Sequence, residues 1–220
     1  IMVGPTGCGK TTTLYAMLNL INSPSRNILT IENPVEYELP GITQISIDPD
    51  QDLDFSKTLR AALRQDPDVI LIGEIRDEET AEIAVKAALT GHLVLTTLHS
   101  RDALTVIQRL KNLGISADLL SETLNLIVSQ KLVRRLCRHH RREKNCRNCR
   151  GTGYHGRTPL YEILHLNQDL RDRIRENVSG PALLEGVEGV YFRGMKETAG
   201  LLLEQRITDK KELRPHLEGF

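Results

Sequence analysis

Long apolar runs and a surplus of either charge are both missing from this sequence of 220 residues. No apolar stretch approaches the roughly 20 residues that a membrane-spanning helix requires, and the first residues lack the basic start and apolar stretch of a secretory signal. Lysine plus arginine number 29, as do aspartate plus glutamate, so net charge provides no general attraction to nucleic acid or membrane. We therefore expect a soluble, cytoplasmic protein.

Cysteine is also scarce, and the chain shows no internal repeat. A chain of this length buries roughly 70% of its unfolded surface, so it does not need disulfides for stability. Three of the four cysteines, Cys137, Cys146 and Cys149, lie within thirteen residues of one another and beside histidines. This clustering favours a metal site over disulfides.

Apolar patterning predicts alternating strands and helices up to about residue 115. The run "VILI" at 69–72 is entirely apolar, as in a strand buried on both faces. Asp54 and the pair Asp66-Pro67 predict the start and the end of one helix, and Gly91 predicts the end of the next. This alternation is typical of a parallel sheet with helices on both faces. The predicted strands are 1–3, 27–31, 69–72 and 92–97, and the predicted helices lie within 11–21, 54–68, 77–91, 167–177, 192–204 and 209–214.

The segment "GPTGCGKT" at 4–11 satisfies the phosphate-loop pattern G-x-x-x-x-G-K-[ST]. Glycines let such a loop curl, so that its N–H groups and the positive end of the following helix face phosphate oxygens. We expect Lys10 to reach the β- and γ-phosphates of a nucleotide and Thr11 to ligate Mg²⁺. A chance glycine turn before a helix is the alternative. The predicted nucleotide-binding residues are Gly4, Pro5, Thr6, Gly7, Cys8, Gly9, Lys10, Thr11 and Thr12.

Hydrolysis also needs an acidic site at a neighbouring strand end, to hold magnesium or orient water. The segment "NILTIENPVE" ends a strand at Glu32 and turns toward Glu36, and "DPDVILIGEIRD" ends another at Glu74. We expect these carboxylates at the carboxyl edge of the sheet, beside the phosphate loop, although solvated loop acids are the common alternative. No N-K-x-D guanine signature is present, which weakens a GTPase interpretation.

The cysteine cluster has the pattern C-x₂-H-x₅-C-x₂-C through Cys137, His140, Cys146 and Cys149. Two such pairs can converge on one tetrahedral Zn²⁺, and a site without an open position is structural. Zinc binding could then supply on the order of 10 kcal/mol to the folding of this polar loop. His139 is a competing ligand, the interval between the pairs is short, and three reduced surface thiols are the alternative.

The same region is strongly basic. Nine of the twenty residues from 131 to 150 are Lys or Arg, and only Glu143 is acidic. Clustered cations can bind nucleic-acid phosphates, but this run has no interleaved aromatic residues to stack on bases. A solvated surface, anionic lipid or an acidic partner is equally consistent with it, so we do not expect nucleic acid as a partner.

Four blocks occur in a specific order: "GPTGCGKTTTLY", "TIENPVE", "LRQDPDVILIGEIRDEETAEIAVKAALTGHLVLTTLHS" and "QKLVRRLC…C..C.GTGYHGRTPLYEIL". Together they resemble the motor ATPases of type II secretion and type IV pilus assembly, from residue 1 to about 165 and more weakly to the end. The resemblance implies an α/β fold: a RecA-like P-loop NTPase core with a mainly parallel sheet, a small zinc-binding insertion and a C-terminal helical subdomain. It also implies a hexameric ring that couples ATP hydrolysis to extension of a pilin or pseudopilin fibre.

The resemblance assigns roles to individual residues. Glu36, in the acidic box "IENPVE", corresponds to the base that activates water, and Glu74 to a Walker B glutamate that acts through magnesium. His99, in "GHLVLTTLHS", corresponds to a contact with the γ-phosphate; without the resemblance it reads as a buried strand-end histidine. The implied cofactors are ATP, Mg²⁺ and Zn²⁺. The implied partners are further copies of the chain and the inner-membrane platform and cytoplasmic anchor proteins, which would place it at the cytoplasmic side of the inner membrane.

The sequence departs from the family pattern at several positions. Asn33 replaces the aspartate of the usual E-D-P-V-E, which removes one negative charge from the site. Ser100-Arg101 replaces Thr-Asn and adds a cation near His99. Cys8 replaces the usual serine at a tolerant position, and His140 stands where a cysteine is common.

Only three apolar residues precede the phosphate loop, whereas a central strand usually has about five. The resembling ATPases carry a further domain ahead of this point, which supplies arginines to a neighbouring subunit. We therefore expect the carboxyl-terminal motor portion of a longer protein, or the product of a truncated reading frame, with weak activity alone. The expected division is 1–130 for the ATPase core, 131–160 for the basic zinc-binding segment and 161–220 for the helical subdomain.

Two other functions are consistent with the residues. The chain could be a catalytically weak nucleotide- and zinc-binding fragment that acts only as an interaction module. It could also be a nucleic-acid translocase that uses the basic segment. The sequence does not distinguish secretion from pilus assembly or DNA uptake, because partners select the cargo.

Overall fold

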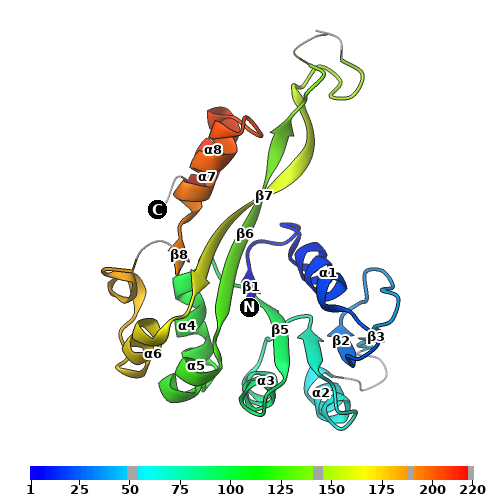
Figure 1. Ribbon diagram of the computed structural model, residues 1–220, viewed down its shortest axis with the longest axis vertical. Helices are drawn as coiled ribbons and strands as arrows, with labels where there is room; N and C mark the ends of the chain where they lie inside the picture. The colour runs from blue at the N-terminus through cyan, green and yellow to red at the C-terminus, as the bar shows by residue number, and fades with distance from the viewer. Residues whose placement is uncertain (49–53, 141–145, 188–190, 218–220) are drawn as a thin grey trace.

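An eight-stranded sheet forms the centre of the computed structural model, which describes residues 1–48, 54–140, 146–187 and 191–217. The strand order is β3-β2-β4-β5-β1-β6-β7-β8 (Figure 1). The strands from β3 to β6 pair in parallel, whereas β7 and β8 are antiparallel to their neighbours. The predicted mainly parallel α/β fold is thus confirmed. The strands are β1 (Met2–Val3), β2 (Ile28–Glu32), β3 (Thr43–Ser46), β4 (Val69–Ile72), β5 (Leu93–Leu98), β6 (Leu126–Leu136), β7 (Tyr154–His165) and β8 (Phe192–Arg193).

The helices begin and end where local side chains satisfy their free backbone groups. The Asp54 carboxylate accepts the Lys57 N–H at 2.7 Å and caps α2, and Gly91 adopts φ 101° just beyond α3, as predicted. The helices are α1 (Lys10–Ile21), α2 (Phe55–Leu63), α3 (Glu78–Leu89), α4 (Ala103–Asn112), α5 (Ala117–Thr123), α6 (Gln168–Arg175), the 3₁₀ helix η2 (Gly180–Leu184), α7 (Met195–Glu204) and α8 (Lys210–Leu217).

The two faces of the sheet carry separate hydrophobic cores. On one face α1 packs against alternate strand residues, such as Leu71 and Val128. On the other face α2 to α6 pack against the intervening residues, such as Ile70 and Ile72. Because successive side chains of a strand point to opposite faces, the all-apolar run of β4 is buried on both sides.

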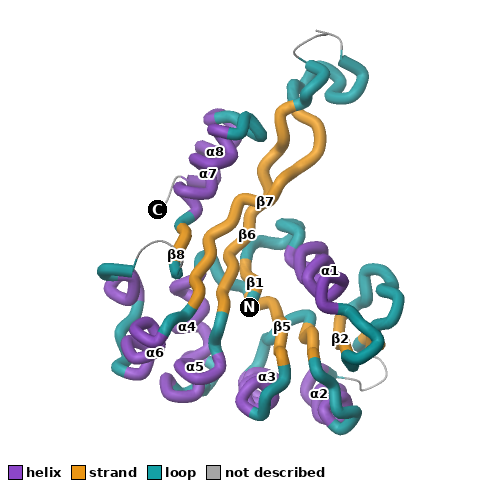
Figure 2. Tube along the Cα trace, in the orientation of Figure 1, coloured by secondary structure: helices purple, strands orange, loops and turns teal. Residues whose placement is uncertain are grey.

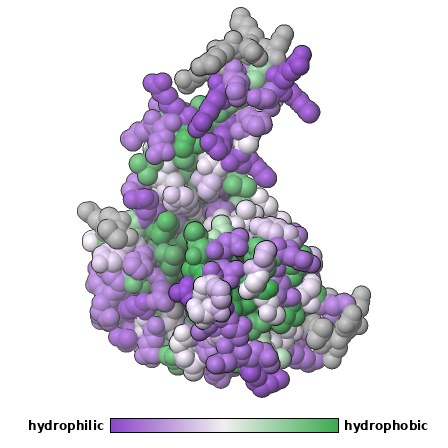
Figure 3. All heavy atoms as spheres, turned by 45° about the vertical axis from the view of Figure 1, so that its right-hand side comes forward, coloured by the Kyte–Doolittle hydropathy of each residue, from purple (hydrophilic) through white to green (hydrophobic). Residues whose placement is uncertain are grey.

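A long antiparallel hairpin, which the sequence analysis did not predict, extends the sheet beyond its parallel part. Strands β6 and β7 pair from Leu126↔His165 to Leu136↔Tyr154, and their outer half projects away from the rest of the sheet (Figures 1 and 2). Helices α7 and α8 pack on this half through a small apolar core that includes Val133 and Leu160. On the face drawn in Figure 3, most of the coloured residues of this upper part are hydrophilic.

The hairpin crosses both expected domain boundaries, at 130 and 160, since β6 and β7 run through them. Strands of all three expected parts belong to one sheet. The division into three domains stays a prediction.

Candidate functional site

The predicted phosphate loop connects β1 to α1, in the strand–loop–helix context that the pattern requires. Gly4, Gly7 and Gly9 adopt positive φ angles of 142°, 75° and 85°, which residues with a side chain rarely adopt. Helix α1 begins at Lys10, directly after the loop, so its N-terminal N–H groups face the loop. The Lys10 ammonium donates to the carbonyl oxygens of Gly4 at 2.9 Å and Pro5 at 3.3 Å, and so lies over the loop.

A cleft of about 1000 Å³ opens between this loop and the ends of β2, β4 and β5. Glu36, Glu74 and His99 line this cleft, as do the loop residues from Thr6 to Thr12. The structure therefore brings the three predicted catalytic side chains together with Lys10. Gly4 and Pro5 belong to the loop but are not among the lining residues, and neither is Arg101.

Glu74 follows β4 and is partly shielded from solvent, with 15% of its side chain exposed. The Arg76 guanidinium lies 2.5 Å from one carboxylate oxygen, and the His99 Nε2 lies 3.6 Å from the other. The hydrogen bond with Glu74 raises the pKa of Arg76. His99 was expected to be buried if it had only a structural role, but 65% of its side chain is exposed, which leaves it accessible in the cleft.

The end of β4 is held close to its neighbours. The Thr97 hydroxyl donates to the Gly73 carbonyl oxygen at 2.6 Å. A Cβ added at Gly73 would lie 3.2 Å from the Ile31 carbonyl oxygen. Glycine thus permits the close approach of β4 to β2 that sets the position of Glu74.

Glu32, at the end of β2, also lines the cleft but is buried, with 3% exposure, and accepts three hydrogen bonds. Its carboxylate accepts from the hydroxyls of Tyr15 at 2.5 Å and Thr30 at 2.6 Å, and from the Gln44 amide at 3.3 Å. Burial and the neighbouring carboxylate raise the pKa of Tyr15. This network anchors α1 to β2, whereas Glu36 in the following loop is exposed to the cleft.

The cleft also contains residues that were not predicted from the sequence, among them Arg76 and Gln130. Arg76 lies in the loop after β4, and Gln130 lies on β6. The Gln130 amide donates to the Cys8 carbonyl oxygen at 2.7 Å and accepts from the Thr13 hydroxyl at 2.9 Å. A signal for Gln130 did exist, because "LIVSQ" places a large polar residue at the end of an apolar run.

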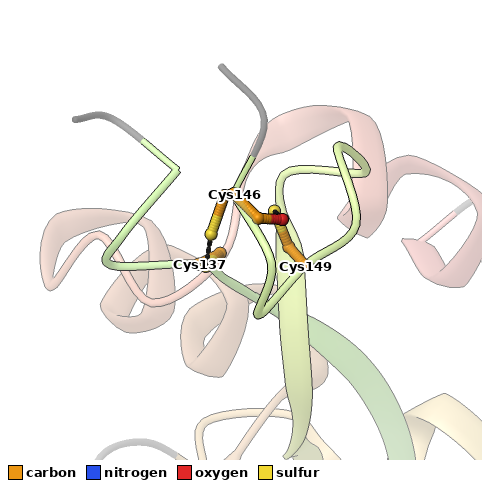
Figure 4. A group of neighbouring side chains, drawn as sticks. All are labelled: Cys137, Cys146 and Cys149. Carbon is orange, nitrogen blue, oxygen red and sulfur yellow. Dashed lines mark hydrogen bonds between the residues drawn. The ribbon is translucent and has the colours of Figure 1, made fainter. Parts of the chain in front are cut away.

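The three clustered cysteines converge at the tip of the hairpin (Figure 4). Cys137, Cys146 and Cys149 are buried, and their sulfur atoms lie within 4.8 Å of one another. The His140 Nδ1 lies 3.3 Å from the Cys149 sulfur, whereas His139 is exposed. Burial raises the pKa of Cys137, and the N–H of Cys149 lowers the pKa of Cys146. Three converging cysteine sulfurs are donors that suit zinc. His140 lies beside Cys149 but is not in the group of atoms that lie within 4.8 Å of one another, so its place as the fourth ligand stays a prediction. The interval 141–145 lies outside the described residues.

Residues 1–214 match the model of the family described as type II/IV secretion system protein. The chain belongs to the type II/IV secretion system protein family. The "Type II secretion system protein HxcR" of Pseudomonas aeruginosa is 47% identical over 204 residues, which cover 90% of this chain and 44% of the relative. The "Type IV pilus assembly ATPase PilB" of the same organism is 40% identical in an alignment that covers 97% of this chain and 42% of the relative. The chain thus spans less than half of these two relatives.

A solved structure shares the fold of this chain. The crystal structure of "the Pilus Retraction Motor PilT and Bound ADP" matches with a TM-score of 0.79 and 33% identity over 99% of this chain and 60% of that one. No helix among the described residues is both long enough and apolar enough to cross a membrane.

Proposed function

We propose that this chain is the ATP-hydrolysing motor portion of a type II secretion or type IV pilus assembly ATPase. The full-length protein would form a hexameric ring that couples hydrolysis to extension of a pilin or pseudopilin fibre. It would act at the cytoplasmic side of the inner membrane, with a membrane platform and a cytoplasmic anchor protein as partners. The observation that carries the proposal is the single cleft that holds the phosphate loop together with Glu36, Glu74 and His99.

Different residues of the cleft suit phosphate binding, magnesium binding and proton transfer. The loop amides and Lys10 would bind the phosphates of ATP, and His99 would contact the γ-phosphate. Thr11 and Glu74 would hold Mg²⁺, which neutralises phosphate charge. Glu36 is the proposed base, because it is exposed to the cleft and can receive a proton from water. Glu32 is less suited to this role, since three donors already occupy its buried oxygens.

The cysteine cluster supports a second, structural part of the proposal. Cys137, His140, Cys146 and Cys149 would hold one Zn²⁺ at the tip of the hairpin. The position of His140 beside the Cys149 sulfur favours it over the exposed His139. Bound zinc would stabilise the folded state of this basic segment, whose charged side chains cannot form a hydrophobic core.

Magnesium-dependent phosphate release from ATP tests the proposed activity in three variants of the purified chain. We expect Lys10→Ala to lose turnover by about 100-fold or more, together with nucleotide binding. Glu74→Gln should lose turnover but still bind ATP. Glu82→Gln is the matched control, because Glu82 is exposed on α3 and pairs with Lys86 away from the cleft.

The outcome also separates this function from the binding-only alternative. A chain that binds ATP but gives the same background rate in wild type and Glu74→Gln would be an interaction module without catalysis. Turnover above this background that survives Lys10→Ala would contradict both the proposed motor function and the binding-only alternative.

A further inference from the structure

Gln130 is a buried polar side chain, 3% exposed, on the strand beside the phosphate loop. Its amide nitrogen donates to the Cys8 carbonyl oxygen at 2.7 Å, and its amide oxygen accepts from the Thr13 hydroxyl at 2.9 Å. A backbone carbonyl can only accept, so the orientation of the Gln130 amide is fixed by its first partner. The two hydrogen bonds enclose residues 9–12, which contain most of the proposed phosphate-binding groups.

The bond to Cys8 sets the orientation of one peptide plane. In a planar trans peptide the C=O of one residue and the N–H of the next point in opposite directions. Because the Cys8 carbonyl points at Gln130, the Gly9 N–H points away from it. Backbone N–H groups that share one direction in such a loop form the concave surface that receives an anion.

The loop lies directly against Gln130, with no room for a side chain between them. A Cβ at Gly4 would lie 2.2 Å from the Gln130 carbonyl oxygen, and a Cβ at Gly9 would lie 3.2 Å from its amide nitrogen. Contacts this close transmit the position of β6 to the loop, because neither backbone can shift without the other.

We propose that Gln130 is a positioning residue of the nucleotide site, which holds the Cys8–Gly9 peptide and the first turn of α1 in the phosphate-binding orientation. This inference rests on the proposed function, because it assumes that the loop binds nucleotide. It assigns to β6, which lines the same cleft through Gln130 and Leu132, a role in nucleotide affinity.

The test measures the affinity of the 220-residue chain for Mg-ADP by calorimetry. Gln130→Met keeps the length of the side chain and removes both hydrogen bonds. We expect it to weaken binding by roughly three- to tenfold. The amide resonance of Gly9 in the nucleotide-free protein should also shift, which a loss of general stability would not cause well below the melting temperature.

The matched control is Ser129→Ala, one residue earlier on β6. Ser129 is equally buried, but its hydroxyl donates to the Arg101 carbonyl oxygen at 3.3 Å, outside the loop. We expect this variant to bind Mg-ADP within about twofold of wild type. Two variants of Thr13 test the second hydrogen bond alone. Thr13→Val removes the hydroxyl that donates to Gln130, so the affinity for Mg-ADP should fall. Thr13→Ser keeps this hydroxyl, so the affinity should stay near that of wild type.

The outcomes separate this inference from the proposed function. If wild type binds Mg-ADP and folded Gln130→Met binds it equally well, the positioning role is wrong and the nucleotide site stands. If Gln130→Met does not fold, unchanged affinity in Thr13→Val overturns the inference. If wild type itself does not bind, the proposed function falls and the inference falls with it.

Discussion

Removing the hydroxyl of Tyr15 tests whether Glu32 anchors helix α1 to the sheet. Tyr15 is 0% exposed and Glu32 is 3% exposed, and the hydroxyl donates to Glu32 Oε2 at 2.5 Å. Thr30 and Gln44 donate to the other carboxylate oxygen, Oε1. Among the described residues, Tyr15 is therefore the donor on which Oε2 depends, and Tyr15→Phe leaves this oxygen buried without that hydrogen bond.

The expected cost follows from the charge and the burial of the pair. A hydrogen bond to an ionised group contributes about 1.5–3 kcal/mol to stability, and both Tyr15 and Glu32 are buried. We therefore expect Tyr15→Phe to lower the free energy of unfolding by about 2 kcal/mol. For a chain of this size the melting temperature should fall by about 4–8 °C.

Urea denaturation followed by far-UV circular dichroism measures the effect, since the chain has no tryptophan for a fluorescence signal. Tyr37→Phe is the matched control: its ring lies edge-on to Tyr15 at 4.7 Å between centroids, but the residue is 51% exposed. We expect the control to change stability by less than about 0.5 kcal/mol. Equal losses in the two variants would refute the anchoring role of Glu32.

Two further predictions concern the hairpin. Cys149→Ser and His140→Ala should each reduce the zinc that copurifies with the chain, measured by atomic emission, whereas His139→Ala should retain it. Loss of zinc in His139→Ala and its retention in His140→Ala would contradict the ligand set. Burial raises the pKa of Glu162 above its usual value of 4.5, so the folded state binds the proton more tightly than the unfolded state and stability falls as pH rises above that value. Glu162→Gln can still accept the Ala103 N–H, but it cannot ionise, so its stability should not fall with pH in this way. Urea titrations at several pH values measure the difference in stability between wild type and this variant. A difference that does not change with pH would contradict the prediction.

The parallel core could be predicted because each signal was local. The run 69–72 is apolar without interruption, Asp54 caps a helix that it immediately precedes, and the phosphate-loop pattern fixes a strand before it and a helix after it. The carboxyl ends of parallel strands lie at one edge of a sheet, so Glu36, Glu74 and Lys10 were expected together without any long-range information. All three line one cleft in the structure, and their roles stay a prediction.

The hairpin could not be predicted, because its strands lack the usual signals. Strand β7 contains Gly156 and Pro159, and a proline inside an apolar run argues against a central strand. The outer half of β6 carries Arg134 and Arg135, which read as part of a charged segment. The choice between His139 and His140 was equally inaccessible, because it depends on how the chain turns at the tip.

The register of β6 explains how one strand serves both the loop and the C-terminal helices. Gln130 contacts the phosphate loop, and the Leu132 side chain would lie 3.6 Å from a Cβ at Gly9, so these alternate residues face the same side. Lys131, whose ammonium donates to the His216 carbonyl oxygen at 2.9 Å, and Val133 face α7 and α8.

A slip of one residue would exchange these two sets of side chains, which makes the register of β6 as far as Val133 essential. The irregularity in the pairing with β7 lies beyond it, between Arg134 and Leu136. The shift therefore leaves the loop-facing residues Gln130 and Leu132 in register with β7. The tip of the hairpin lies beyond this irregularity, so we expect a change in its length or ligands to leave the contact between Gln130 and the phosphate loop in place.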